Sequence, residues 1–248
     1  KITFAETFRI PKMYEFTIIV PVYDEEENLT RVERELLAYT KIASKKTSIL
    51  FVNDGSKDKS QQLIEEICHR NEAFHFISFD KNYGLSTALK AGFDFAESPL
   101  LGYIDSDLQT IPADFNLLLE YVGEYDLVTG IRINRKDGFA KSISSKIANA
   151  VRRAFTQDRV ADTGCPLKVI KAEYAKRIPM FKGSHRFLPA LVLLQNGSVK
   201  QVPVRHFTRT AGATKFGILN RVWGSLVDCF VFLWIKRKYI NYEIKNKG

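Results

Sequence analysis

The chain has 248 residues, which suits one large α/β domain or two small ones sharing a sheet, and we expect one domain with appendages. Hydrophobic residues make up 45% of it and charged residues 26%, a balance that excludes intrinsic disorder. Three widely spaced cysteines, Cys68, Cys165 and Cys229, form no CxxC pair and fit neither a disulfide framework nor a zinc site. Residues 1–12 lack the apolar core of a secretory signal, so we expect a cytoplasmic protein.

The net charge of +9 hides an asymmetry between the two halves of the chain. Residues 1–131 carry 13 Lys and Arg against 22 Asp and Glu, whereas residues 132–248 carry 24 against 6. The basic half suits an anionic partner such as nucleic acid, a phosphorylated lipid or an acidic membrane face, although a merely solvated basic surface would look the same. Its cations are not interleaved with aromatic residues in an RNA-binding motif, and the acidic half would repel a phosphate backbone. We therefore expect no nucleic-acid partner.

Short β-rich runs alternate with helical patterns up to residue 105. We expect strands at 16–20, 48–52, 74–79 and 100–104. After Pro21 ends the first strand, Asp24 is placed to cap a helix, and Glu27 completes a capping box three residues later. A second helix is capped near Asp58, and a third covers 86–96. Strands separated by helices of this length predict βαβ units, hence a mostly parallel sheet with helices on both faces.

Polar clusters follow each of these four strands. They are residues 23–25, 53–56, 82–84 and 105–107. Because ligands of parallel sheets bind beyond the carboxyl ends of the strands, the clusters should converge on one rim and form one site.

The second half alternates less regularly. We expect a strand at 126–130, a basic amphipathic helix at 139–155, an apolar helix at 188–194 and an edge strand at 199–207. The apolar run 222–235 is followed by three basic residues and interrupted by Asp228. As a helix it would reach only about 21 Å, short of a hydrocarbon core about 30 Å thick. It is therefore either an interfacial helix with a basic anchor or a helix packed in the core.

Asp105 and Asp107 carry the strongest chemical signal. In an extended segment residues i and i+2 project the same way, so both carboxylates can reach one divalent cation, or divide between metal and ribose. Mg²⁺ and Mn²⁺ prefer such oxygen ligands and keep open positions for substrate phosphates. An isolated DxD is more often a polar turn, but the position after the fourth strand favours a metal site for a diphosphate.

Several blocks of the sequence resemble the successive signatures of the inverting glycosyltransferases of family 2. They are IVPVYDEE at 19–26, VNDGSKD at 52–58, NYG at 82–84 and DSDLQ at 105–109. Two later blocks, GSHRFLP at 183–189 and RTAGATKFG at 209–217, are similar to the branch that includes dolichol-phosphate mannose synthase and bacterial polyprenyl-phosphate sugar transferases. The chain departs from the family pattern at Asp24, where Asn is usual, and at Ser106, where Ala is common.

The resemblance implies a glycosyltransferase A-type fold, a Rossmann-like α/β architecture with a C-terminal helical segment. Residues 1–131 would form the nucleotide-sugar-binding part, 132–217 the acceptor-binding part of the same domain, and 218–248 a C-terminal helix. The resemblance further implies that certain side chains contact the nucleoside or base and that others serve the ribose, diphosphate and metal. The first group is Pro21, Tyr23, Glu25 and Asp54, and the second is Asp105 and Asp107.

On the acceptor side, the similar blocks imply that several cations meet phosphate groups. These are Arg186, Arg205, Arg209 and Lys215, with Arg209 also a candidate catalytic residue. Asp162 is either a base for the acceptor or an organiser of its loop, and a phosphate acceptor, already anionic at neutral pH, requires no strong base. Cys165 has no activating neighbour in the sequence, so we do not expect a nucleophile there.

Taken together, these features predict an inverting transfer from a nucleotide diphosphate sugar to a polyprenyl phosphate, assisted by Mg²⁺ or Mn²⁺, at the inner face of the cytoplasmic membrane. Such a reaction belongs to cell-envelope glycan biosynthesis. The alternative acceptor is a hydroxyl of a glycan or lipid-linked saccharide, which would make Asp162 indispensable as a base. A basic nucleic-acid-binding protein and an inactive nucleotide-binding relative are further alternatives. The sequence leaves the sugar, the base and any homo-oligomerisation open.

Overall fold

The structure, a computed structural model, describes residues 13–133, 152–207, 218–241 and 245, without the side chains of 218–223 and 225. Its centre is a seven-stranded sheet with the strand order β3-β2-β1-β4-β6-β5-β7. The strands are β1 (Phe16–Val22), β2 (Thr47–Asn53), β3 (Phe74–Ser78), β4 (Leu100–Tyr103), β5 (Leu127–Arg132), β6 (Lys168–Lys171) and β7 (Val199–Val204). All neighbouring pairs are parallel except those of β6, which is antiparallel to both β4 and β5. The expected mostly parallel sheet is thus confirmed.

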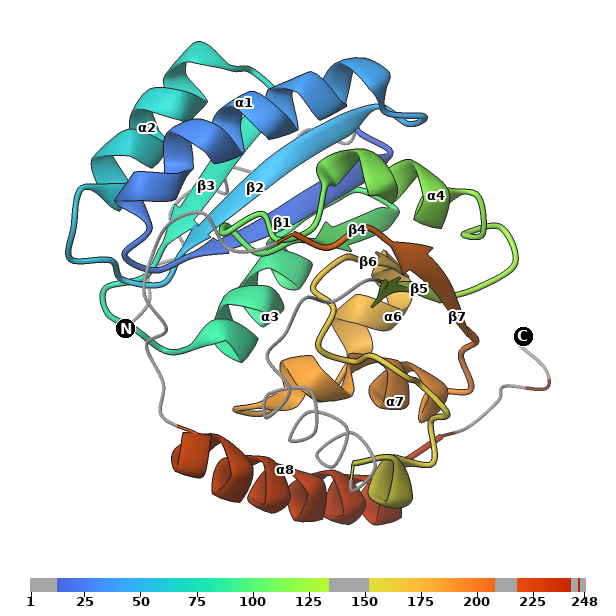
Figure 1. Ribbon diagram of the computed structural model, residues 1–248. Helices are drawn as coiled ribbons and strands as arrows, with labels where there is room; N and C mark the ends of the chain where they lie inside the picture. Colours follow the sequence, from blue (N-terminus) through green and yellow to red (C-terminus); the bar gives the residue numbers. More distant parts are fainter. Residues whose placement is uncertain (1–12, 134–151, 208–217, 242–244, 246–248) are drawn as a thin grey trace.

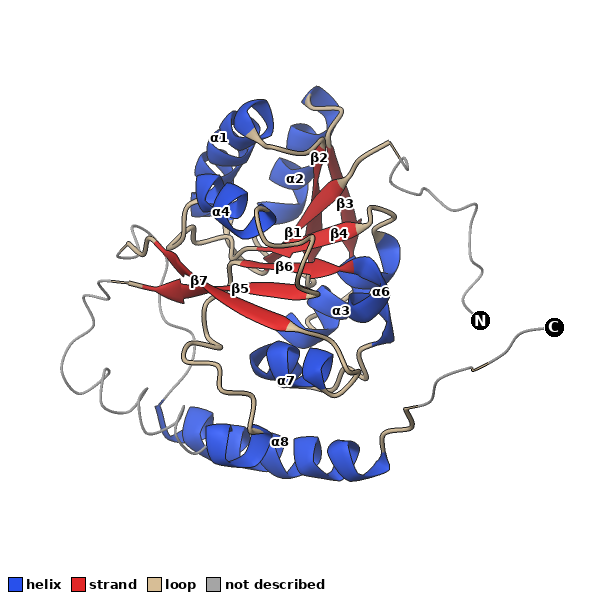
Figure 2. Ribbon diagram, turned by 90° about the vertical axis from the view of Figure 1, so that its right-hand side faces the viewer, coloured by secondary structure: helices blue, strands red, loops and turns tan. Residues whose placement is uncertain are grey.

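Helices cover both faces of the sheet, as Figures 1 and 2 show. One layer contains α1 (Glu26–Ile42), α2 (Ser60–Arg70), η1 (Pro112–Asp114) and α4 (Phe115–Leu119). The other contains α3 (Leu85–Phe95), α6 (Ala172–Arg177), η2 (Ser184–Phe187) and α7 (Leu188–Leu193). The long helix α8 (Ile218–Lys238) lies beyond α7, on the outside of this second layer. Among the described residues, no helix combines the length and apolar composition that crossing a bilayer requires.

The sheet is buried because its strands are apolar on both faces. In β1, Phe16, Ile18 and Val20 pack in the core under α1 and α2, whereas Ile19 packs in the core under α3. Strands covered on both sides form nearly continuous hydrophobic runs, which is why the sequence pattern located them. The predicted edge strand is also present, as β7 at the end of the sheet. Of the expected helix at 139–155, only residues 152–155 are described; they are helical, and the helix continues to residue 156.

The predicted capping box at the start of α1 is wrong. The helix begins at Glu26, and Asp24 adopts a left-handed backbone (φ +49°) with Oδ1 accepting the N–H of Lys57 at 2.7 Å. The N–H of Glu26 instead donates to Oδ2 of Asp58 (3.1 Å), and that of Glu25 to Oγ of Ser60 (2.9 Å). The helix N-terminus is therefore capped by the loop between β2 and α2, because that loop brings acceptors to the donors that a helix leaves unpaired. These hydrogen bonds hold the loop after β1 against the loop after β2.

The close packing of α3 on β1 leads to a stability prediction. A Cβ added at Gly92 would lie 2.6 Å from Cγ2 of Ile19, a branched atom that cannot move without its backbone. We expect Gly92→Ala to lower the free energy of unfolding by about 1–3 kcal/mol, the usual range for overpacking a core. Chemical denaturation measures this change. Gly123→Ala is the control, since an added Cβ there meets no atom within 4 Å; equal stability of the two variants would contradict this packing.

Candidate active site

The polar clusters expected to converge do lie at one rim of the sheet. Tyr23 follows the end of β1, Asn53 ends β2, and Asp105 follows β4. These strands are mutually parallel, so their carboxyl ends share an edge. Because β6 runs the other way, it begins at this rim, which also receives Lys168. The rim is therefore built from both the acidic and the basic half of the chain.

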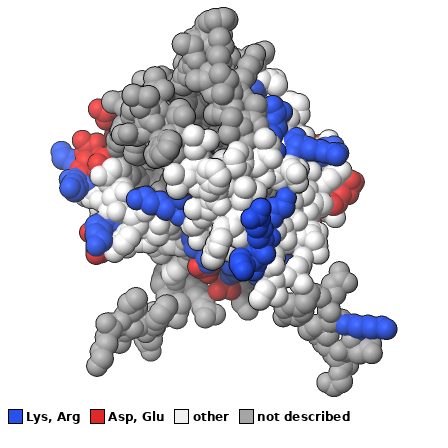
Figure 3. Space-filling view, turned by 90° about the horizontal axis from the view of Figure 1, so that it is seen from below, with Lys and Arg blue, Asp and Glu red and all other residues white. Residues whose placement is uncertain are grey.

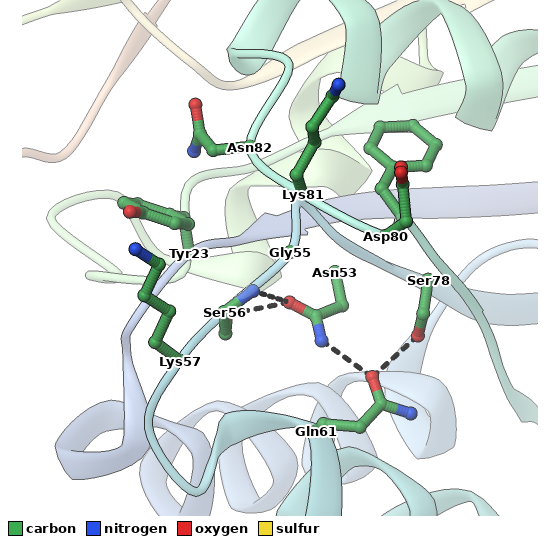
Figure 4. Close-up of a pocket in the computed structure, with 11 residues that line it drawn as sticks. Tyr23, Asn53, Gly55, Ser56, Lys57, Gln61, Ser78, Asp80, Lys81 and Asn82 are labelled. Carbon is green, nitrogen blue, oxygen red and sulfur yellow. Dashed lines mark hydrogen bonds between the residues drawn. The ribbon is translucent and has the colours of Figure 1, made fainter.

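A cavity of about 420 Å³ opens beyond β1, β2 and β3 (Figure 4). Its lining residues come from the ends of β2 and β3, the loops that follow β1, β2 and β3, and the first turn of α2; they are Tyr23, Asn53, Gly55, Ser56, Lys57, Gln61, Ser78, Phe79, Asp80, Lys81 and Asn82. A chain of hydrogen bonds fixes one wall: Nδ2 of Asn53 donates to Oε1 of Gln61 (2.6 Å), and Oγ of Ser78 donates to the same oxygen (2.6 Å). The Oγ of Ser56 donates to Oδ1 of Asn53 (2.6 Å). The wall is thus polar and held in place before any ligand binds.

Asp54 and Gly55 hold two of the cavity's loops together. The carboxylate of Asp54 accepts the N–H groups of Tyr83 (2.7 Å) and Gly84 (2.9 Å). Burial raises the pKa of Asp54, and these two hydrogen bonds oppose that rise. Gly55 has φ +68°, and a Cβ there would lie 2.3 Å from the carbonyl carbon of Lys81. Only glycine allows this approach of two backbones.

Of the four predicted nucleoside-binding residues, only Tyr23 lines this cavity. Pro21 lies within β1, and Asp54 lies behind the lining residues with both oxygens turned to the next loop. Oε2 of Glu25 accepts Nδ2 of Asn28 at 2.5 Å, at the start of α1. The contact of Asp54 with a base stays a prediction; the structure shows Asp54 organising the loop.

Asp105 and Asp107 form a repelling pair at the end of β4. The Tyr103 hydroxyl donates to Oδ1 of Asp105 (2.5 Å), and the N–H of Gln109 donates to Oδ1 of Asp107 (3.2 Å). Burial, followed by the charge of Asp107, raises the pKa of Asp105 to about 6. A carboxylate whose ionised form is disfavoured by burial and by a neighbouring like charge is stabilised by a bound cation.

This acidic pair fits Mg²⁺ or Mn²⁺ as part of a substrate complex. No three acidic, His or Cys side chains gather into a metal site among the described residues. Mg²⁺ is commonly held by one or two carboxylates together with substrate phosphates and water, rather than by a full protein cage. The donor set of Asp105 and Asp107 therefore matches a cation that arrives with, or is completed by, a diphosphate.

Asp162 is engaged by Arg132 at the end of β5. Oδ2 accepts the N–H of Arg132 (3.2 Å) and its Nε (2.7 Å), and Oδ1 accepts Nη2 (2.8 Å). Burial would raise the pKa of Asp162, but the hydrogen bonds and charge of Arg132 lower it overall. A carboxylate with a lowered pKa and both oxygens occupied is a poor base. This geometry favours the organising role of Asp162 over the catalytic one.

Lys168 is a buried cation that sequence reasoning missed. Its Nζ donates to the carbonyl oxygens of Thr163 (3.3 Å) and Cys165, and lies 5.8 Å from the centre of the Tyr103 ring. Its residue is only 2% exposed, and burial lowers its pKa against the opposing pull of nearby acidic groups. The available signal was a single lysine inside the apolar run 167–170.

Burial also raises the pKa of the Cys165 thiol to about 11, which agrees with the expectation that it is no nucleophile.

The cations predicted to meet phosphates lie in different settings. Arg205 is bound by Asp114, whose Oδ1 accepts Nε (2.9 Å) and Nη2 (2.5 Å), and Arg186 pairs with Asp228 of α8 at 3.5 Å. Arg209 and Lys215 lie outside the described residues. The described residues that precede them end at Phe207.

The loop after β7 joins the loop that carries the acidic pair. The N–H of Phe207 donates to the carbonyl oxygen of Gln109 (2.8 Å), and Nε2 of Gln109 donates to the carbonyl oxygen of Phe207 (3.3 Å). Gln109 is two residues from Asp107. The segment that continues into the basic block at 209–217 therefore starts beside the predicted metal site.

Two curated proteins with related sequences have a polyprenyl phosphate in their names. The chain is 32% identical to an undecaprenyl-phosphate 4-deoxy-4-formamido-L-arabinose transferase of Pectobacterium atrosepticum over 210 residues, 83% of this chain and 64% of that protein. It is 29% identical to a dodecaprenyl-phosphate galacturonate synthase of Rhizobium johnstonii over 229 residues, 90% of this chain and 68% of that protein. The chain thus spans about two thirds of the length of these relatives.

Solved structures share the fold at low sequence identity. A glucosyl-3-phosphoglycerate synthase of Mycobacterium tuberculosis, in complex with Mn²⁺, UDP and glucosyl-3-phosphoglycerate, matches with a TM-score of 0.68 and 12% identity over 90% of this chain and 80% of that one. A mannosyltransferase of Pyrobaculum calidifontis, in complex with GDP-Man and Mn²⁺, matches with a TM-score of 0.63 and 14% identity over 93% and 71%. These likenesses confirm the glycosyltransferase A-type fold.

The family profile agrees with the motifs and the fold. The profile of glycosyl transferase family 2 matches residues 17–178, which include the cavity, the acidic pair and Lys168. The ordered motifs, the sheet topology and this match lead to the same assignment. The chain therefore belongs to glycosyl transferase family 2.

Proposed function

We propose that this chain transfers a sugar, with inversion at the anomeric carbon, from a nucleotide diphosphate donor to a polyprenyl phosphate in the presence of Mg²⁺ or Mn²⁺. One observation carries the proposal: the repelling pair Asp105 and Asp107 follows β4 at the rim. Strand β4 lies next to β1, one of the three strands that frame the polar cavity. The names of the curated relatives support the acceptor, and the solved relatives in complex with Mn²⁺ support the metal.

The donor half of the reaction uses residues 1–131. The cavity beyond β1 to β3 has the size and polarity to take a nucleoside, with Tyr23 as a wall and the Asp54 loop as its frame. Asp105 and Asp107 would hold the metal, which supplies neutralisation of the charge that develops on the departing nucleoside diphosphate. The protein's part is to present these carboxylates in a fixed position, with the Tyr103 hydroxyl orienting Asp105.

The acceptor half uses residues 132–217 and needs no general base. A phosphate monoester is anionic at neutral pH and can attack the anomeric carbon without losing a proton to the protein. The commitment of Asp162 to Arg132 is consistent with such an acceptor, because a hydroxyl acceptor would require a free carboxylate. We propose that Arg209 and Lys215, which lie outside the described residues, bind the acceptor phosphate.

Helix α8 (in the C-terminal part, 218–248) presents one face to the body and another outward. Cys229 and Phe232 are buried, and the Phe232 ring stacks on that of Phe187 at 5.6 Å. Val227, Phe230 and Trp234 are 48%, 62% and 65% exposed at helical spacing. The buried side chains agree with the packed alternative, and we propose that the exposed ones serve the interfacial alternative.

A lipid surface fits the outward face of α8. The three exposed apolar side chains are followed by the basic run 236–238 at the end of the helix. Seen from the side on which α8 lies, the described surface shows many uncharged residues, Lys and Arg side chains at several points, and a few Asp and Glu side chains (Figure 3). Apolar burial combined with attraction to anionic lipid is the usual basis of interfacial binding. Peripheral association with the membrane that contains the acceptor follows from this surface.

The product of the reaction tests the proposed function. Purified protein, a panel of labelled nucleotide sugars, undecaprenyl phosphate and Mn²⁺ or Mg²⁺ should yield label that partitions into organic solvent. Chelation with EDTA, or Asp107→Asn, should reduce this yield at least about 100-fold, since a metal contributes several kcal/mol to transition-state stabilisation. A strictly water-soluble product would overturn the acceptor, and full activity in EDTA would overturn the metal.

Gly55→Ala tests the cavity as the nucleoside site. The added methyl would force the Gly55 loop away from the backbone of Lys81, so we expect nucleotide affinity to fall about tenfold or more, equivalent to roughly 1.4 kcal/mol. Titration of UDP and GDP in the presence of Mn²⁺ measures this. Gly123→Ala, far from any contact, should bind as the wild type does. Unchanged affinity in Gly55→Ala would remove the cavity from the donor site.

The outward face of α8 gives a third test. Replacing Phe230 and Trp234 by Ser should weaken binding to vesicles with anionic lipid at least about tenfold, because each buried aromatic contributes roughly 1.5–3 kcal/mol. Co-sedimentation with the vesicles measures it. The matched control is Ile42→Ser, which removes a 60% exposed apolar side chain from α1 in the opposite helix layer. Equal vesicle binding by the double variant and the wild type would exclude α8 as the docking face.

A further inference from the structure

The charged side chains at the rim interact with one another but differ in their hydrogen-bond partners. Arg132 and Asp162 neutralise each other through three hydrogen bonds. Lys168 instead donates to neutral carbonyl oxygens, so its charge is not matched by a carboxylate bonded to it. Lys168 interacts electrostatically with both Asp162 and Asp105, and it is a buried cation with no carboxylate hydrogen-bonded to it.

Topology places the Lys168 charge beside the acidic pair. In the antiparallel pairing of β4 and β6, Lys168 lies opposite Tyr103, and the side chains of such a pair share a face of the sheet. Its ammonium lies 5.8 Å from the centre of the Tyr103 ring, whose hydroxyl donates to Asp105. Lys168 and Asp105 interact electrostatically. The cation is therefore fixed on the floor of the site, within a poorly hydrated environment where charge acts strongly.

We propose that Lys168 is a positioning residue whose fixed positive charge makes binding of the divalent ion depend on the donor's diphosphate. This inference rests on the proposed function and deepens it. A buried cation repels a free divalent ion approaching Asp105 and Asp107, and attracts the diphosphate that accompanies it. Metal and donor then bind as one complex, and the site holds metal weakly when no donor is present.

The two halves of this effect have opposite signs, which separates it from structural damage. Without the charge of Lys168, free Mn²⁺ should bind more tightly, whereas a nucleoside diphosphate should bind less tightly. A variant that merely loosens the rim would weaken both. Lys168→Gln is the suitable substitution, because its amide retains a donor for the carbonyl oxygens of Thr163 or Cys165 while losing the charge.

The experiment is a pair of calorimetric titrations on the folded proteins, first with Mn²⁺ alone and then with UDP or GDP at saturating Mn²⁺. For Lys168→Gln we expect affinity for Mn²⁺ alone to rise about three- to tenfold and affinity for the nucleotide to fall by a similar factor. Lys168→Arg, which keeps the charge, should stay near the wild type in both. Lys171→Gln is the matched control, since it removes a lysine from the other end of β6, where Lys171 pairs with Asp126.

Two results would overturn the inference. One is a folded Lys168→Gln variant with unchanged or weaker affinity for Mn²⁺ alone. The other needs no variant and applies if Lys168→Gln fails to fold: the wild type should bind Mn²⁺ at least about tenfold more tightly with UDP or GDP than without, and equal affinities contradict the proposal. Failure of the proposed function is distinguishable, because the wild type would then bind none of the nucleotides.

Discussion

Repulsion between two carboxylates in a poorly hydrated rim is the constraint on which this site depends. Asp105 and Asp107 follow a buried strand, and burial together with their mutual charge raises the pKa of Asp105 to about 6. Such a pair is stabilised by positive charge from any source. The protein supplies part of it with Lys168 and Arg132, and we propose that a divalent metal supplies the rest. The acidic and basic halves of the chain, separate in sequence, meet here for that reason.

The remainder of the rim keeps this arrangement rigid through contacts between loops. Asp24 and Asp58 cap backbone groups across the β1 and β2 loops, and Asp54 secures the loop after β3. Gly55 permits the close approach of two of these loops. Several acidic side chains of the first half therefore bind backbone N–H groups, and we propose that the pair after β4 also binds the ligand. A preformed site of this kind loses little conformational entropy on binding its donor.

The sequence predicted those features that depend on local pattern and on parallel-sheet topology. Strands buried on both faces are continuous apolar runs, and the convergence of their terminal loops follows from their direction. Individual side-chain hydrogen bonds between residues distant in the sequence were not predictable. The cap on α1 comes from Asp58, 32 residues on, and Asp162 finds Arg132 30 residues away. Strand β6 has only four residues and begins with a lysine, so neither its length nor its composition marked it as the strand between β4 and β5.

The most direct test is to locate the metal. Crystals grown with Mn²⁺ and a UDP- or GDP-sugar should show an anomalous peak at about 2.1 Å from carboxylate oxygens of Asp105 or Asp107, bridged to the donor's phosphates. The nucleoside should occupy the cavity beside Tyr23. A bound donor whose phosphates lie away from both carboxylates, or a manganese peak elsewhere in the molecule, would contradict the account.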